Sequence, residues 1–167
     1  AGEILGIAGL VGSGRTETAR LVCGIDRPEA GGILLDGRPV AIRSPRHAIA
    51  LGIGYLSEDR KGDGLVLGMN CQENFALPNM RKFSPAGWIR QALLRDRFQR
   101  HVDSLGVRLS GHSQPAAELS GGNQQKLVLA KWLETDSRVL VFDEPTRGID
   151  VGAKYEIHQL MHRLAEA

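Results

Sequence analysis

A glycine-rich segment near the start of the chain could bind phosphate. Residues 9–16 read GLVGSGRT, which matches the pattern G-x-x-x-x-G-K-[ST] except that Arg15 stands where the pattern has lysine. In such a loop, backbone N–H groups wrap a phosphate, and the N-terminus of the following helix adds partial positive charge. The hydroxyl of Thr16 would then bind a nucleotide-bound magnesium ion. Taken alone, these eight residues could also form a glycine-rich turn without a ligand.

Two adjacent carboxylates follow an apolar run much later in the chain. Residues 139–142 (VLVF) suit a central parallel strand, and Asp143 and Glu144 come directly after it. Ligands of a doubly wound sheet bind beyond the carboxyl ends of its parallel strands, so these carboxylates should lie near the glycine loop. Asp143 can then hold magnesium through water, and Glu144 can orient or deprotonate an attacking water. Without the glycine loop, the pair would indicate only the start of a loop.

A second anion-binding pattern lies between these two motifs. Residues 119–123 read LSGGN and precede an expected helix at 123–133, with Ser120 at or near its N-cap. A serine and two glycines at a helix N-terminus can bind an anion, although a cap after a flexible turn is the alternative. One chain cannot easily place two such sites on a single nucleotide. The second site therefore suggests a partner domain that brings its own nucleotide.

The elements around these motifs alternate between strands and helices. The apolar run at residues 4–8 predicts a strand before the glycine loop, and residues 16–23 predict a helix after it. Asp36-Gly37 is a strong hairpin signal and predicts antiparallel strands at 33–35 and 40–42. This pattern favours an α/β fold with an attached small antiparallel β-subdomain.

The middle of the chain predicts a helical insert. A helix at 45–51 begins with proline at its first position, and a strand follows at 52–56. Ser84-Pro85 predicts the start of a second helical region, and a last helix is expected at 153–167. Apolar residues recur at helical spacing after that start: Trp88, Ile89, Ala92, Leu93 and Phe98. Residues from about 73 to 115 therefore read as helices inserted into an α/β core.

Composition limits the classes of protein that fit. The chain has 167 residues, 42% of them hydrophobic, which suits one globular domain, and a net charge of +2 that argues for neither nucleic acid nor a membrane surface. The arginines between the apolar positions of the insert are interrupted by Asp96 and Asp103 and are expected on solvent-facing helix surfaces.

Cys23 and Cys71 lack metal-ligand or redox spacing. No apolar run has the roughly 20 residues of a membrane-spanning helix, and no secretory signal is visible.

Both ends of the sequence favour a piece of a longer protein. The chain begins without an initiator methionine, directly before the expected strand at 4–8, and it ends inside the helical pattern at 153–167. We therefore expect a truncated domain.

In this order, the three motifs resemble those of ATP-binding-cassette (ABC) ATPases, with residues 119–122 as the signature motif. The hairpin and the insert are similar to that family's β-subdomain and helical subdomain. The resemblance implies a P-loop NTPase (RecA-like) core, with residues 1–72 as its first part including the hairpin. It implies a helical subdomain at 73–117, and the signature helix and the strand before Asp143-Glu144 at 118–167.

A closer resemblance is to the second cassette of two-cassette bacterial importers of ribose, xylose, arabinose, galactose and related compounds. It rests on the segments SEDRK at 57–61, Gly64-Leu65, Glu73-Asn74 and LSGGNQQK at 119–126. The resemblance implies an ATP hydrolase that binds ATP with magnesium and couples it to monosaccharide uptake. It places the protein peripherally on the cytoplasmic face of the bacterial inner membrane. The implied partners are a second cassette in the same polypeptide, transmembrane permease subunits and, indirectly, a periplasmic or extracellular sugar-binding protein, with no nucleic acid.

The resemblance also implies roles for individual residues. Thr16 and Asp143 would support magnesium, and Glu144 would be the catalytic base. Ser120 and Gly122 would contact the γ-phosphate of a nucleotide held by the partner cassette, and residues 148–150 match the loop that communicates across the dimer. The implied nucleotide-binding residues are Gly9, Gly12, Ser13, Gly14, Arg15, Thr16, Glu58, Ser120, Gly121, Gly122 and Asp143.

Some positions depart from the family's pattern. The planar fork of Arg15 is larger than a lysine ammonium and cannot act as a compact point charge among phosphates. Glu58 stands where most cassettes have a glutamine, and its carboxylate would alter the metal's surroundings and repel γ-phosphate. Asn123 replaces a more usual glutamine, and His158 and His162 are most simply helix-surface residues. The switch histidine and the adenine-stacking aromatic are expected outside these 167 residues.

Two functions stay open from these residues. The first is the ATPase half-site of an importer. The second is a hydrolysis-poor nucleotide-binding and dimerisation module that supports a partner cassette's active site, which Arg15 and Glu58 favour and Glu144 opposes. A cassette protein acting on ribosomes or in DNA repair is disfavoured, because the loop at 58–60 matches importers.

Overall fold

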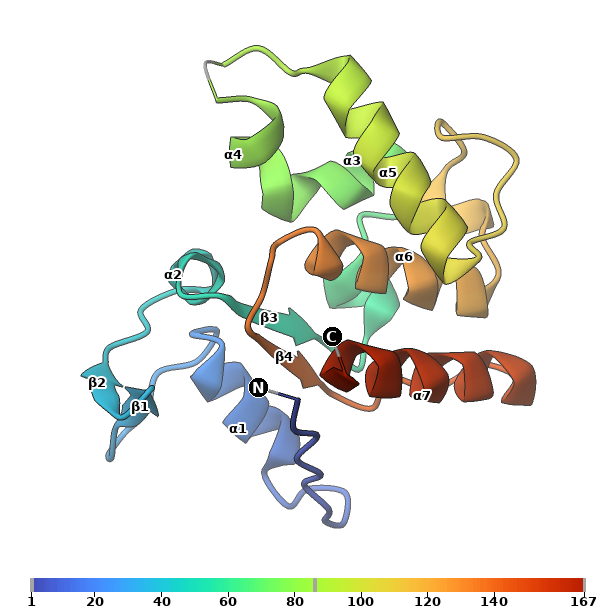
Figure 1. Ribbon diagram of the computed structural model, residues 1–167. Coiled ribbons are helices and arrows are strands. Elements are labelled where there is room, and N and C mark those ends of the chain that lie inside the picture. Colours follow the sequence, from blue (N-terminus) through green and yellow to red (C-terminus); the bar gives the residue numbers. More distant parts are fainter. Residues whose placement is uncertain (1, 86, 167) are drawn as a thin grey trace.

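The computed structural model describes residues 2–85 and 87–166. The described chain has two small sheets, with helices grouped in an upper part and around the parallel strands (Figure 1). In chain order the elements are α1 (Arg15–Val22), β1 (Ile33–Leu35), β2 (Arg38–Val40), α2 (Pro45–Ala50), β3 (Ile53–Leu56), the π-helix η1 (Arg60–Gly64), α3 (Cys71–Ala76), the 3₁₀ turn η2 (Leu77–Asn79), α4 (Met80–Phe83), α5 (Gln91–Leu105), the 3₁₀ turn η3 (Ala116–Glu118), α6 (Gly121–Leu133), β4 (Val139–Phe142) and α7 (Val151–Glu166).

The parallel pair β3–β4 positions the carboxylates. Ile53 lies opposite Val139 and Leu56 lies opposite Phe142, so both strands end at the same edge. The Asp143 N–H donates to the Leu56 carbonyl at 2.9 Å and extends the ladder by one residue. The strand predicted at 139–142 is confirmed, and the one predicted at 52–56 begins one residue later.

The predicted hairpin is present with a shifted return strand. Ile33 pairs with Val40 and Leu35 with Arg38, so the second strand covers 38–40 and not 40–42. Asp36 and Gly37 have φ of 52° and 73°, the left-handed pair that a two-residue hairpin turn requires. This tight turn fixes the register. Ile42 instead leaves the strand and packs into a small core with Cys23, Ala48 and Ile53.

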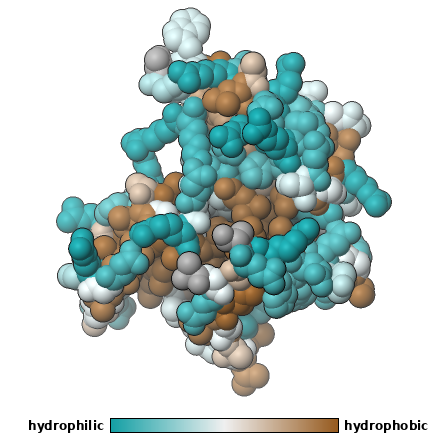
Figure 2. All heavy atoms as spheres, viewed as in Figure 1, coloured by the Kyte–Doolittle hydropathy of each residue, from teal (hydrophilic) through white to brown (hydrophobic). Residues whose placement is uncertain are grey.

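The prediction of a strand at residues 4–8 is wrong for the described chain. These residues form no strand, and the side chains of Ile4, Leu5 and Ile7 are 48%, 77% and 67% exposed. A strand needs a hydrogen-bonding neighbour, and in residues 2–85 and 87–166 the only partner of β4 is β3. The segment instead starts beside the end of α7, where a Cβ added to Gly2 would lie 2.9 Å from the Ala165 carbonyl oxygen, and it leads into the exposed glycine loop at the lower end of the molecule (Figures 1 and 2).

The helical insert is built around an aromatic cluster. Phe75, Phe83 and Phe98 are at most 1% exposed, and the Phe75 ring centroid lies 5.9 Å from that of Phe83 and 5.2 Å from that of Phe98. These rings join α3, α4 and α5. Each buried phenylalanine contributes a large apolar area, so the cluster supplies much of the packing that holds these short helices together.

The second helical region begins later than predicted. The helix α5 starts at Gln91, and Trp88 precedes it with 86% of its surface exposed. The Arg90 N–H donates to the Phe83 carbonyl at 2.8 Å, so the chain from α4 closes a loop before α5 begins. The buried face of α5 consists of Leu94, Phe98, Val102 and Leu105, of which only Phe98 belongs to the predicted set.

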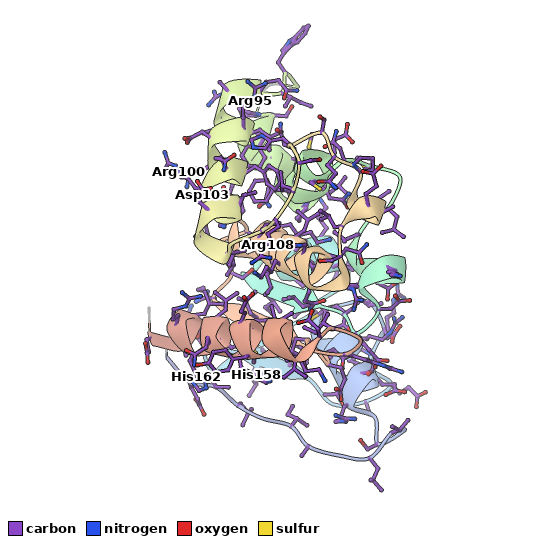
Figure 3. All side chains as sticks on the ribbon, turned by 90° about the vertical axis from the view of Figure 1, so that its right-hand side faces the viewer. Arg95, Arg100, Asp103, Arg108, His158 and His162 are labelled. Atoms are coloured by element: carbon purple, nitrogen blue, oxygen red, sulfur yellow. The ribbon has the colours of Figure 1, made fainter. Side chains whose placement is uncertain are left out.

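The predictions for charged and polar helix surfaces are confirmed. Arg95 and Arg100 point away from the neighbouring helices in Figure 3, and Arg100 pairs with Asp96 at 2.8 Å on the surface. His158 and His162 are exposed on α7. Among the helices of the described residues, none combines the length and the apolar character that a membrane crossing needs.

A buried lysine joins α6 to the end of η1. Lys131 is 7% exposed and its Nζ donates to the Gly64 carbonyl, while the Lys131 carbonyl accepts from Asn79 Nδ2 at 2.9 Å. Burial lowers the pKa of Lys131 from 10.5 to about 8. The charged form therefore opposes folding at neutral pH.

The substitution Lys131→Met should reveal this cost. Between pH 8 and 10.5 the unfolded chain binds more protons than the folded one at this residue, so its contribution to the free energy of unfolding rises with pH. We expect the free energy of unfolding of the wild type, relative to that of Lys131→Met, to rise by roughly 2 kcal/mol between about pH 7.5 and 9.5. Urea unfolding measures this difference. Lys154→Met, at an exposed lysine, is the control. The difference between its free energy of unfolding and that of the wild type should stay constant over this pH range. A constant difference for Lys131→Met as well would contradict the shift.

Candidate functional site

The glycine loop leads directly into α1. The helix begins at Arg15, and its N-cap is Gly14 with φ 83° and no capping side chain. Gly12 also has φ 80°, a left-handed conformation that favours glycine. A Cβ added to Gly9 would lie 2.4 Å from Ser13 Oγ, so the Ser13 side chain would have to move to admit another residue there. The loop therefore leads into an uncapped helix N-terminus, the feature that an anion-binding loop uses.

The residue that departs from the loop pattern contacts the candidate base. Arg15 Nη1 donates to Glu144 Oε1 at 2.9 Å, across 129 positions of sequence. The two side chains are 30% and 43% exposed, so the ion pair contributes roughly 0–1 kcal/mol. Glu144 has φ 45°, a strained conformation for a residue other than glycine. The structure thus brings the glycine loop and the carboxylate pair together, as the sequence predicts.

Asp143 is held by a tyrosine that sequence reasoning missed. Asp143 is 8% exposed, and Tyr55 Oη donates to its Oδ2 at 3.1 Å. Burial, reinforced by the Asp143 charge, raises the pKa of Tyr55 well above its ordinary value, so the phenol stays a donor. The strand register could have found this contact, because Tyr55 lies opposite Val141, two residues before Asp143 and therefore on the same face.

Glu58 has a partner that sequence reasoning also missed. It forms an ion pair with Arg147, which follows the carboxylate pair by three residues. The Glu58 side chain is 32% exposed and that of Arg147 is 66% exposed. The arginine compensates the carboxylate charge, so the repulsion of γ-phosphate expected at Glu58 is reduced.

The signature segment caps α6 as predicted. The helix begins at Gly121, and Ser120 Oγ accepts from the Asn123 N–H at 3.4 Å and from Asn123 Nδ2 at 2.9 Å. A Cβ added to Gly122 would lie 3.0 Å from the Cβ of Ala153, so α7 packs closely here. Ser120 and Gly122 line a groove between α5, α6 and α7.

The two predicted anion sites do not contact each other. Within residues 2–85 and 87–166, no hydrogen bond or ion pair joins segment 119–123 to the glycine loop. The described residues also contain no group of three or more histidine, cysteine or acidic side chains that could hold a metal by themselves. Thr16 and Asp143 stay a predicted magnesium pair whose remaining ligands would come from nucleotide and water.

This combination of glycine loop, capped signature turn and buried strand ending in two carboxylates defines an ATP-binding cassette of the P-loop class. The sequence pattern of the ABC transporter family matches residues 1–147. The chain therefore belongs to the ABC transporter family.

Two curated relatives illustrate the similarity. The chain is 57% identical over 164 residues to a Burkholderia ambifaria protein named for ribose/galactose/methyl galactoside import and ATP binding, covering 98% of this chain and 32% of that protein. It is 48% identical over 166 residues to the ribose import ATP-binding protein RbsA of Chelativorans sp. (strain BNC1), covering 99% and 33%. The chain thus spans about a third of the length of these relatives.

Solved structures support the fold. The dimeric ATP-binding cassette MJ0796, in a post-hydrolysis state bound to ADP and Pi, superposes with a TM-score of 0.77 at 22% identity. The match covers 94% of this chain and 67% of that one. A nucleotide-free cassette from an ABC transporter gives a TM-score of 0.74 at 18% identity, covering 93% and 63%. The predicted cassette fold is confirmed.

The substitution Ser120→Ala should destabilise the signature turn, because it removes the N-cap of α6. The expected loss is about 1 kcal/mol in the free energy of unfolding, measured by urea titration. Ser110→Ala is the matched control, since that hydroxyl makes no hydrogen bond with the residues that the structure describes. Equal stabilities of the two variants would argue against the cap.

Proposed function

We propose that the complete protein containing this chain is the ATP-binding component of a monosaccharide importer of the ribose/galactose type. The observation that carries the proposal is the identity of 57% over almost the whole chain to a relative named for that import. The joining of the glycine loop to the carboxylate pair through Arg15 and Glu144 supports an ATP site. The permease subunits, the sugar-binding protein and the position at the cytoplasmic face of the membrane belong to the same proposal.

In this proposal the nucleotide phosphates bind the backbone of residues 9–14 and the N-terminus of α1. Thr16 and Asp143 would support magnesium, whose chemistry is to neutralise phosphate charge. Tyr55 keeps Asp143 oriented. Glu144 would orient the attacking water and hold the proton it releases. Ser120, Gly121 and Gly122 would serve the nucleotide of a second cassette, which agrees with the finding that, within the described residues, no hydrogen bond or ion pair joins the signature turn to the glycine loop.

The Arg15–Glu144 pair supports unequal cassettes, with this one as the second and less active. Arginine presents a fork that matches a carboxylate, whereas lysine presents a compact charge. Because the pair is partly exposed and contributes only roughly 0–1 kcal/mol, phosphates can compete for Arg15. While the pair is formed, Arg15 occupies Oε1 of Glu144, so this oxygen is not available to accept a proton from water. A relative of three times this chain's length has room for another cassette.

Transport in vesicles tests the function. We expect the complete protein, reconstituted with its permease subunits, to accumulate radiolabelled ribose or galactose when ATP and magnesium are present together. Omitting ATP, or omitting magnesium, should abolish accumulation, and a disaccharide should not accumulate. ATP-dependent uptake of the disaccharide without uptake of any pentose or hexose would contradict the proposal.

The substitution Glu144→Gln tests the inequality of the sites. In the complete two-cassette protein it should remove less than half of total ATP turnover, because the other site carries most of the hydrolysis. The same substitution at the matching glutamate of the other cassette is the control and should remove most of it. Near-complete loss with Glu144→Gln alone would refute unequal sites.

A further inference from the structure

One arginine outside the predicted site joins segments that are far apart in sequence. Arg60, in η1, donates from Nη1 to the Arg147 carbonyl at 2.9 Å and from Nη2 to the Gly148 carbonyl at 3.2 Å. Its Nε lies 3.4 Å from Gln124 Oε1 on α6. All these contacts use the guanidinium fork. A single side chain thus connects the loop after β3, the loop after β4 and the signature helix.

The segment that carries Arg60 is itself fixed at both ends. Asp59 Oδ1 accepts from the N–H groups of Lys61 and Gly62 at 3.1 and 2.9 Å, which caps η1. At the other end, the buried Lys131 Nζ donates to the Gly64 carbonyl. The backbone that carries Arg60 is therefore held at both ends of η1.

The receiving segment offers two successive carbonyl groups to Arg60. Gly148 has φ 65°, a left-handed turn that directs its carbonyl toward Arg60. A Cβ added to Gly121 would lie 2.8 Å from Arg60 Nη2 and 3.5 Å from the Gly148 carbonyl oxygen, so the signature turn also packs against this contact. Beside it, the ion pair of Glu58 with Arg147 joins the same two loops a second time.

We propose that Arg60 is a positioning residue that, with the Glu58–Arg147 pair, locks residues 57–64 to residues 144–150. A shift of either loop then moves the other, and with it Glu144 and the signature turn. The guanidinium presents N–H groups on two separate nitrogens to the two successive carbonyls in a fixed planar geometry, whereas lysine has a single nitrogen on a flexible stem. The consequence for turnover rests on the proposed function, whereas the lock itself is a property of the folded chain.

Hydrogen exchange of the complete protein, without nucleotide, tests the lock directly. Arg60→Gln should speed exchange of the Arg147 amide, which donates to the Glu144 carbonyl at 3.0 Å, by about tenfold or more, because the substitution removes the charge-assisted hydrogen bonds to the Arg147 and Gly148 carbonyls. Arg60→Lys, which keeps the charge, should give a smaller increase. Lys61→Gln is the matched control, because that ammonium makes no hydrogen bond or ion pair with the described residues, and it should leave exchange unchanged. Thermal melting identifies any variant that fails to fold.

Turnover separates the lock from the proposed function. Arg60→Gln should lower kcat of the complete protein for ATP by less than half, the same limit as for Glu144→Gln, and leave KM unchanged, because none of the Arg60 hydrogen bonds within the described residues reaches the glycine loop. Unchanged exchange at 144–150 in folded Arg60→Gln and Arg60→Lys would overturn the lock, even if the wild type hydrolyses ATP. Faster exchange in a protein that does not hydrolyse ATP would uphold the lock and refute the function.

Discussion

The parallel pairing of β3 with β4 is the constraint on which the rest of the structure depends. It sets Leu56 beside Phe142, so the loops that follow both strands leave the sheet at one edge. Residues 57–64 and 143–150 therefore meet, although more than eighty positions separate Arg60 from Arg147. Tyr55 reaches Asp143 for the same reason. A register shift of one residue would turn these side chains to the other face of the sheet, so the residues of the site would no longer lie together.

The charged side chains that depart from the family's pattern at this edge of the sheet are paired with opposite charges. Arginine occupies the lysine position of the glycine loop and glutamate occupies a glutamine position, yet each charge has an opposite partner in Glu144 and Arg147. Both pairs are partly exposed, so they add little stability. Their value lies in orientation, since each joins a loop at the nucleotide side to the segment after β4.

Much of the architecture followed from local signals. Asp36-Gly37 identified a hairpin because few residues tolerate two left-handed positions, and Ser120 identified the start of α6 because its hydroxyl can cap the helix. The strand at 139–142 followed from an uninterrupted apolar run. The strand expected at 4–8 failed because apolar residues favour burial without specifying the neighbour that buries them. The helix start expected at 84–85 failed because a Ser-Pro pair also suits a loop, and here a hydrogen bond from Arg90 to Phe83 closes a loop before α5 begins.

The sequence by itself therefore determined the family, the three motifs and their chemical roles as hypotheses, because spacing within a loop or a helix turn is a local property. Only the tertiary structure decided which charges meet. The pairs Arg15–Glu144 and Glu58–Arg147, the Tyr55–Asp143 hydrogen bond and the reach of Arg60 all join distant segments. Such contacts depend on the parallel register and on loop geometry, which no short stretch of sequence encodes.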